Sequence, residues 1–253
     1  MAEPLLAIQG LRKHFGGVHA TDDLDLEIAP GELHAIIGPN GAGKTTLIAQ
    51  LAGELRPDAG AIRFDGRDVT HAPGHRRAAL GLARSFQVTS IFRSFSALEN
   101  VVLAVQARAG HSFRFWRPVR AREDLVRPAR EALQRVGLEE RADVPAALLA
   151  HGEHRQLEIA MALVARPKLL LLDEPTAGMS ADESQRMVRF LAGLKGTVTM
   201  LLVEHDMDAV FSLADRITVL VQGKPIATGA PAEIRADPRV REAYLGEDQA
   251  AVE

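Results

Sequence analysis

The chain has 253 residues, of which 47% are hydrophobic and 25% are charged, and its formal net charge at pH 7 is −3. This length accommodates one large α/β domain, or a core with a subdomain, and the slight acidic excess argues against nucleic-acid binding through overall positive charge. Because cysteine is absent, disulfides and thiol chemistry are excluded, and a metal would need oxygen or histidine ligands.

The start of the chain and its apolar runs predict a cytosolic protein. The first four residues, Met-Ala-Glu-Pro, lack the basic and then apolar profile of a secretion signal. No apolar run approaches the ~20 residues that a membrane-spanning helix needs. A role at a membrane is therefore expected to come through partner proteins.

Strands and helices alternate along most of the chain, which predicts a parallel sheet with helices on its faces. The residues from about 88 to 160 are instead rich in arginine and alanine and have helical patterning. We therefore expect a single domain over 1–253, with an α/β core (1–87 and 160–253) and an inserted helical subdomain (88–159). The predicted strands are Leu5–Leu11, Leu24–Ile28, Glu32–Ile37, Ala61–Phe64, Lys168–Leu172, Thr197–Val203 and Ile217–Gln222. The predicted helices are Lys44–Leu51, Ala121–Val136, Glu153–Ala165, Ala181–Leu194 and Asp206–Leu213.

The segment Gly38–Thr45 (Gly-Pro-Asn-Gly-Ala-Gly-Lys-Thr) matches the phosphate-loop pattern G-x-x-x-x-G-K-[ST] without a mismatch. It follows a buried strand and opens a helix, so its backbone N–H groups and the helix N-terminus can surround a phosphate. Lys44 is expected to reach the β- and γ-phosphates of ATP, and the Thr45 hydroxyl is expected to bind Mg²⁺. The residues expected to contact ATP in this segment are Gly38, Pro39, Asn40, Gly41, Ala42, Gly43, Lys44, Thr45 and Thr46.

Two carboxylates end the apolar run Leu169–Leu172. A buried parallel strand delivers such residues to the edge of the sheet where α/β proteins bind ligands. Asp173 is expected to hold Mg²⁺ through water, because Mg²⁺ keeps several waters and uses few carboxylates. Glu174 is then placed to polarise the attacking water.

In their order, these motifs resemble the ATP-binding cassette (ABC) family over essentially the whole chain. Pro175–Gly178 continues from the carboxylates as in that family, and Glu204-His205-Asp206 follows the next strand. The resemblance implies that His205 contacts the γ-phosphate and holds Glu174 and the water in line. It also implies that Gln87 couples Mg²⁺ and the water to a transmembrane partner, and that Phe15 stacks on adenine. The catalytic residues are then Lys44, Gln87, Glu174 and His205, and the metal residues are Thr45, Gln87 and Asp173.

The family's signature segment, L-S-G-G-Q, caps the γ-phosphate of the opposite subunit in an ATP-bound dimer. In this chain the corresponding residues are Leu149, Ala150, His151, Gly152 and Glu153. Only Leu149 and Gly152 agree with the signature. Ala150 lacks a hydroxyl donor that would contribute roughly 1.5–3 kcal/mol to binding a charged group. We therefore expect backbone N–H groups to bind the phosphate here, with the Glu153 carboxylate facing its own helix N-terminus.

A second departure from the family is Ser180, which stands where many relatives have the aspartate of the loop linking the two ATP sites. This departure bears on the strength of coupling between the two ATP sites.

Several stretches resemble the ATP-binding subunits of branched-chain amino-acid importers, above all the tail Glu233–Pro238 with Glu242–Gly246. The implied partners are transmembrane permeases, a second ATP-binding subunit (a second copy or a paralogue) and, indirectly, a periplasmic solute-binding protein. The implied place is the inner face of the cell membrane. Importers of urea or of other small polar or aromatic solutes share much of the pattern and remain alternatives.

Other functions fit the motifs less well. A soluble ABC ATPase acting on ribosomes or DNA usually has two cassettes or a long coiled-coil insert, and this chain has neither. A P-loop kinase or GTPase would lack the Glu204-His205 pair.

A basic and aromatic stretch in the insert could contact the permease or anionic headgroups, form a solvated face, or bind nucleic acid. That stretch contains Arg108, Phe113, Arg114, Phe115, Trp116, Arg117, Arg120 and Arg122.

Overall fold

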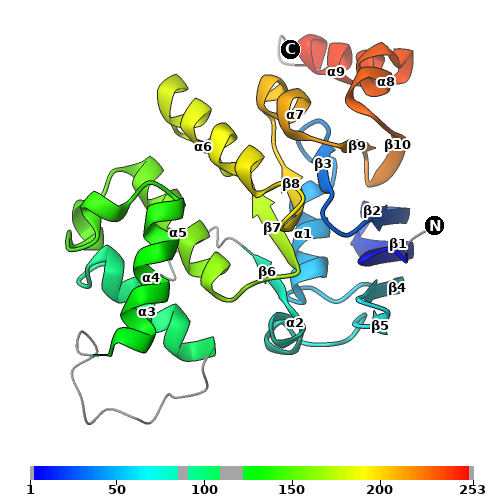
Figure 1. Ribbon diagram of the computed structural model, residues 1–253. Coiled ribbons are helices and arrows are strands. Elements are labelled where there is room, and N and C mark those ends of the chain that lie inside the picture. Colours follow the sequence, from blue (N-terminus) through cyan, green and yellow to red (C-terminus); the bar gives the residue numbers. More distant parts are fainter. Residues whose placement is uncertain (1–2, 85–90, 109–121, 251–253) are drawn as a thin grey trace. The chain divides into compact units, whose positions relative to one another are not determined.

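The computed structural model describes residues 3–84, 91–108 and 122–250. The chain divides into two compact units (Figure 1). The first comprises 1–82, 168–174 and 194–253, and the second comprises 83–167 and 175–193. The segment 88–159 lies inside the second unit, which additionally contains 83–87, 160–167 and 175–193. The division into one domain with a subdomain of the predicted extent stays a prediction.

A four-stranded antiparallel sheet begins the first unit, in the order β2-β1-β4-β5. Its strands are β1 (Leu6–Phe15), β2 (Val18–Ile28), β4 (Ala59–Phe64) and β5 (Arg67–Asp68). The first two strands are longer than predicted, because they pair up to Phe15 and Val18 and leave only Gly16 and Gly17 for the turn. Gly16 has φ +59°, a conformation that glycine adopts without a steric penalty.

A second sheet of six strands contains the mainly parallel part of the core, in the order β10-β9-β3-β8-β7-β6. β3 pairs in parallel with β8 and β9, β7 pairs in parallel with β8, and β10 is antiparallel to β9. All residues of β3, β7 and β8 are buried, in keeping with their continuous apolar runs. The strands are β3 (Leu33–Ile37), β6 (Leu82–Arg84), β7 (Leu169–Asp173), β8 (Thr199–Val203), β9 (Arg216–Val221) and β10 (Lys224–Gly229).

The helix after the glycine loop, α1 (Lys44–Ala52), packs its apolar face into a core shared with both sheets. Leu47, Ile48 and Leu51 are completely buried there. Gly53 ends the helix in the left-handed conformation, one residue beyond Ala52. The other helices of this unit are α2 (Gly74–Leu80), α7 (Met207–Leu213), α8 (Pro231–Ala236) and α9 (Pro238–Ala250).

A buried arginine of α2 holds the C-terminal end of α1. The Arg77 side chain is 1% exposed and donates hydrogen bonds to four backbone carbonyls. Two of them, at Gln50 and Leu51, belong to the last turn of α1 and lie 2.7 Å from Nη1. The others are at Thr70 and Ala72. Because the last carbonyls of a helix lack partners within it and bear partial negative charge, the guanidinium both satisfies and stabilises this end.

The second unit is helical. Its helices are α3 (Ala97–Arg108), α4 (Glu123–Arg135), α5 (His151–Val164) and, except for its last residue, α6 (Ala181–Leu194). Short 3₁₀ turns occupy Glu139–Arg141 and Ala146–Leu148. α3, α4 and α5 contact one another (Figure 1). The predicted fold class is confirmed: an α/β P-loop core with a parallel sheet, an N-terminal antiparallel β region and an inserted helical part.

Among the residues that the structure describes, none of the helices combines the length and the apolar character needed to cross a bilayer.

Candidate functional site

The predicted phosphate loop lies between β3 and α1, and two of its glycines admit no other residue. A Cβ on Gly38 would lie 2.0 Å from the carbonyl oxygen of Leu220, and a Cβ on Gly43 would lie 1.9 Å from that of Ala20. Both also have left-handed backbones, with φ of 147° and 99°. The loop therefore exposes backbone N–H groups next to the N-terminus of a helix, and this arrangement binds phosphate.

The first helical residue after the loop brings a positive charge to it. The Lys44 ammonium donates hydrogen bonds to the carbonyl oxygens of Gly38 at 2.5 Å and Pro39 at 2.9 Å. Its side chain thus folds back over the loop, at the place where a phosphate is expected. Thr45 is exposed and Thr46 is half-buried in the same helical turn. These residues fit a triphosphate, with backbone donors, one ammonium and a hydroxyl.

The strand register brings three candidate segments to one edge of the six-stranded sheet. Val203, the last residue of β8, is level with Ile36 of β3 on one side and with Asp173 of β7 on the other. All three strands are parallel, so the phosphate loop, Glu174 and Glu204 leave the sheet at the same level. The structure therefore brings the phosphate loop beside two segments that follow it by more than a hundred residues in the sequence.

The two carboxylates that end β7 occupy different environments. Asp173 is the last residue of the strand and is 2% exposed. Glu174 has a left-handed backbone, with φ of 47°, and its amide donates to the carbonyl of Val203 at 2.9 Å. This turn brings its side chain to the surface, where 38% of it is exposed. The buried carboxylate of Asp173 fits the Mg²⁺ ligand predicted from the sequence, and the exposed carboxylate of Glu174 is accessible to water.

A histidine faces the exposed carboxylate from the neighbouring strand end. His205 Nδ1 lies 3.9 Å from Glu174 Oε1 and 3.6 Å from Glu204 Oε2. Glu204 is 1% exposed and accepts the backbone N–H of His205 at 2.9 Å, so it fixes the turn that presents the imidazole. Asp206 caps the next helix by accepting the N–H of Ala209. Glu204 has no role among the residues predicted from the sequence, although its place directly after the apolar run Thr199–Val203 is the signal that could indicate one.

The candidate adenine-stacking residue is on the β1–β2 hairpin. Phe15 pairs with Val18 next to the turn, and 51% of its surface is exposed. The same hairpin reaches the phosphate loop, since the Ala20 carbonyl touches Gly43. An exposed aromatic ring on an element that contacts the loop fits adenine stacking, which stays a prediction.

The segment that resembles the family signature opens α5 in the second unit. The helix begins at His151, two residues earlier than predicted, and Ala150 is its N-cap. The carboxylate of Glu153 accepts the backbone N–H of Ala150 at 2.8 Å, so its predicted orientation toward its own helix N-terminus is confirmed. The helix starts early because this bond satisfies an N–H outside it. Gly152 therefore lies within the first turn.

The substituted serine at 180 has a local structural role. It precedes α6, where Glu183 accepts hydrogen bonds from the Ser180 N–H at 2.9 Å and from its hydroxyl at 2.7 Å. The Ser180 hydroxyl in turn lies 3.4 Å from the Glu183 N–H, which completes a reciprocal cap. These bonds lower the pKa of Glu183. The same carboxylate lies 2.9 Å from where a Cβ on Gly152 would be, so the cap of α6 adjoins the first turn of α5.

We expect Ala150→Ser to stabilise the start of α5. No side chain caps this helix, and a serine hydroxyl could accept the N–H of Glu153 while Glu153 keeps its bond to residue 150. The gain should be about 1 kcal/mol of unfolding free energy, together with a modest rise in ATP-driven dimerisation.

Thermal unfolding without nucleotide measures the cap, and light scattering with ATP measures dimerisation. Ala147→Ser, which adds a hydroxyl to an exposed residue outside the helix, is the control. If dimerisation is unchanged while stability rises, the backbone alone suffices for the phosphate.

Some predicted positions lie outside the described residues. They are Gln87 and, in the basic and aromatic stretch, Phe113, Arg114, Phe115, Trp116, Arg117 and Arg120. Arg122 is described, and its guanidinium pairs with Asp124 at 2.6 Å. This arginine is thus engaged within its own chain.

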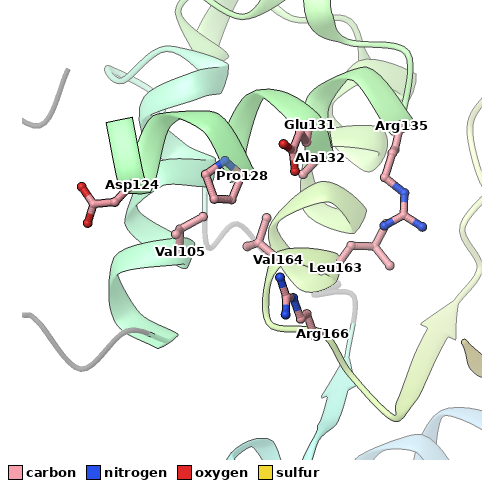
Figure 2. Close-up of a pocket in the computed structure, with 9 residues that line it drawn as sticks. All are labelled: Val105, Asp124, Pro128, Glu131, Ala132, Arg135, Leu163, Val164 and Arg166. Atoms are coloured by element: carbon pink, nitrogen blue, oxygen red, sulfur yellow. The ribbon is translucent and has the colours of Figure 1, made fainter. Parts of the chain in front are cut away.

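Two of the hollows among the described residues lie within the second unit. One, of about 450 Å³, is lined by α4, by Leu163 and Val164 at the end of α5, and by Arg166 beyond that helix. Figure 2 shows four charged side chains around it, those of Asp124, Glu131, Arg135 and Arg166. It contains none of the predicted site residues. The other, of about 470 Å³, includes Gly152 and Glu153.

Comparisons with known proteins identify the family to which the phosphate loop and the two sheets belong. Residues 21–177 match the model of the ABC transporter family. The chain belongs to the ABC transporter family. A second model, the branched-chain amino acid ATP-binding cassette transporter family, matches residues 224–250, which contain β10 and the whole of α8 and α9.

Curated members of the ABC family resemble the chain over nearly its whole length. The high-affinity branched-chain amino acid transport ATP-binding protein BraF of Pseudomonas aeruginosa is 39% identical, over 98% of this chain and 100% of BraF. LivG of Escherichia coli K12, with the same description, is 40% identical at the same coverage. The lipopolysaccharide export system ATP-binding protein LptB of Acidithiobacillus ferridurans is 36% identical, over 96% of this chain and 97% of LptB.

Solved ABC cassettes share the fold. The ADP conformation of MJ1267, an ATP-binding cassette of an ABC transporter, has a TM-score of 0.85 at 28% identity, covering 97% of this chain and 100% of that one. A nucleotide-free cassette has a TM-score of 0.84 at the same identity, covering 96% and 99%. As an ABC ATP-binding domain, this chain binds nucleotide.

Proposed function

We propose that the chain is the ATP-binding and hydrolysing subunit of an ABC importer that takes up branched-chain amino acids through partner permeases. The observation that carries this proposal is the match of residues 224–250 to the branched-chain amino acid cassette family. The similarity to BraF and LivG over the full length of both supports it.

The phosphate loop and α1 would hold the nucleotide. Backbone groups of Gly38–Gly43 would surround the β-phosphate, and Lys44 would turn from the loop carbonyls toward the phosphates. Thr45, Gln87 and Asp173 would hold Mg²⁺. The ion, when bound, neutralises charge on the phosphate oxygens. Phe15 would stack on the adenine ring.

The side chains at the ends of β7 and β8 would act on the attacking water. Glu174 would accept its proton, and His205, whose imidazole faces Glu174 at 3.9 Å, would keep the carboxylate and the γ-phosphate aligned. Lys44 and Gln87 would be the other two catalytic residues. Catalysis of this kind rests on positioning and on stabilising charge that develops on the transferred group.

A second ATP-binding subunit, either another copy or a paralogue, would complete the site. Ala150–Glu153 of that subunit would cap the γ-phosphate, mainly through N–H groups of the first turn of α5 and its helix dipole. Closure of the pair around two ATP molecules would drive the permeases between their two facing states, and hydrolysis would reset them. The subunit would lie at the inner face of the cell membrane. A periplasmic solute-binding protein would be an indirect partner, because it would deliver the solute to the permeases.

Uptake measurements in the source organism test the function. A strain lacking the chain should lose high-affinity uptake of labelled leucine, isoleucine and valine. Wild-type protein should restore it, and Lys44→Ala should not, because the phosphates lose their ammonium partner. Lys168→Ala, which removes an exposed lysine paired with Asp65, should restore uptake and serves as the control.

The same strain distinguishes the alternatives. Unchanged amino-acid uptake combined with lost uptake of urea or another small solute would redirect the assignment to that solute. The similarity to LptB favours lipopolysaccharide export as a second candidate. Intact uptake together with a defect in surface lipopolysaccharide would support that candidate instead.

A further inference from the structure

Two histidines and an aspartate meet on the β1–β2 hairpin, next to the proposed adenine-stacking residue. One ligand atom of each of His14, His19 and Asp22 lies within 4.8 Å of the others. The two imidazole rings are 4.3 Å apart between centroids, in an edge-on arrangement. The site is exposed, since both histidines are exposed and Asp22 is half-buried.

The backbone of the hairpin explains why these rings face each other. His14 and His19 are cross-strand partners, and Phe15 and Val18 form the following pair at the turn. Directly opposed residues of an antiparallel pair project from the same face of the sheet, with Cβ atoms about 5 Å apart. The hairpin is also anchored, because Asp58 accepts the His14 N–H at 2.8 Å and the Lys13 ammonium at 2.7 Å. The rings are therefore held together before any ligand binds.

A lysine forms an ion pair with the aspartate of this cluster. Lys224 Nζ lies 3.2 Å from Asp22 Oδ2. The lysine side chain is 62% exposed, so it can swing into solvent. Lys224 and a metal cation would compete for one carboxylate.

We propose that His14, His19 and Asp22 bind one divalent transition-metal ion, with water completing the coordination. Two imidazole nitrogens and one carboxylate oxygen form a donor set suited to Zn²⁺, Ni²⁺ or Cu²⁺, whereas Mg²⁺ prefers oxygen ligands. The three ligand atoms are close enough to share one ion after small side-chain rotations. This site is separate from the oxygen ligands proposed for Mg²⁺ at Thr45 and Asp173.

The hairpin site is connected to the phosphate loop by two backbone hydrogen bonds. The Asp22 N–H donates to the Gly223 carbonyl at 2.9 Å, and the Gly223 N–H donates to the Ala42 carbonyl at 3.0 Å. Phe15 directly follows one of the ligands. A bound ion would thus fix the hairpin tip, and ATP affinity should differ between the metal-loaded and metal-free protein.

Calorimetric titration of tag-free, chelator-treated protein with ZnCl₂, without nucleotide or Mg²⁺, tests the site. One ion should bind per chain. His19→Ala and Asp22→Asn should each weaken binding at least about tenfold, since even loss of an outer-shell partner has that effect. Lys224→Met should tighten binding by about fivefold, because it removes a competing cation at contact distance. His75→Ala removes an exposed histidine on α2 and should change nothing.

Absorption of bound Co²⁺ provides a second measurement that does not depend on affinity. Its d–d bands should change in His14→Ala and stay unchanged in His75→Ala, with circular dichroism confirming that each variant is folded. The proposal is overturned if the wild-type chain binds no Zn²⁺, or if His19→Ala and His75→Ala bind it with equal affinity. Because nucleotide is absent from the titration, either result leaves the proposed ATPase function untouched.

Discussion

Glu174→Gln should bind ATP with nearly unchanged affinity, dimerise in it, and hydrolyse it at least about a hundredfold more slowly than the unmutated chain. Loss of a positioned general base typically reduces the rate by 10²–10⁴-fold. Glutamine keeps the size of the side chain at the end of β7 but cannot accept the proton. Single-turnover hydrolysis with labelled ATP measures the rate, and light scattering measures the dimer.

Two further variants make this result specific. Glu27→Gln changes an exposed carboxylate of β2 and should hydrolyse ATP normally. His205→Ala should also slow hydrolysis, because the imidazole that faces Glu174 is lost. If Glu174→Gln turns over at the unmutated rate, the assignment of the base is wrong.

Arg77→Met should lower the free energy of unfolding by about 3 kcal/mol or more. The substitution leaves three buried carbonyl oxygens and the part-buried one of Ala72 without their charged donor. Each unsatisfied buried group costs roughly 1–3 kcal/mol. Two of those carbonyls end the helix that begins with Lys44, so ATP affinity should fall as well. Urea unfolding and nucleotide titration measure the two effects.

The neighbouring residue offers a matched control for that substitution. Arg76 precedes Arg77 in α2 and is exposed, so Arg76→Met should stay within about 0.5 kcal/mol of wild type. Arg77→Lys should have an intermediate effect, because one ammonium cannot replace a planar fork of five donors. Equal stability of Arg76→Met and Arg77→Met would show that the carbonyls find other partners.

The sequence predicts the parts of this molecule in which the residue type and its spacing have a single physical explanation. The phosphate loop is one, because only glycine can occupy positions 38 and 43 beside the carbonyls of Leu220 and Ala20. The apolar strands are another, since a continuous run of leucines must be buried on both faces. Both predictions rely on local chemistry alone.

Features that depend on tertiary contacts were not predictable in the same way. An arginine within a short helix usually lies at the surface, so nothing in the sequence distinguishes Arg77 from Arg76. The strand β10 escaped prediction because Lys-Pro-Ile-Ala-Thr-Gly has little apolar alternation, and it forms only by pairing with β9. The sequence marks Ser180 only as a departure that bears on the coupling between the two ATP sites, and its reciprocal bonds with Glu183, which cap α6, depend on the folded chain.

The backbone conformation of Glu174 lowers the stability of the fold at a residue that the proposed ATP hydrolysis requires. A residue with a side chain at φ 47° costs roughly 1–2 kcal/mol relative to an ordinary conformation, and glycine would remove most of that cost. A redesign that optimised thermal stability alone would therefore favour glycine at position 174 and delete the proposed base. Thermostabilising this cassette without silencing it requires that this one unfavourable conformation be left in place.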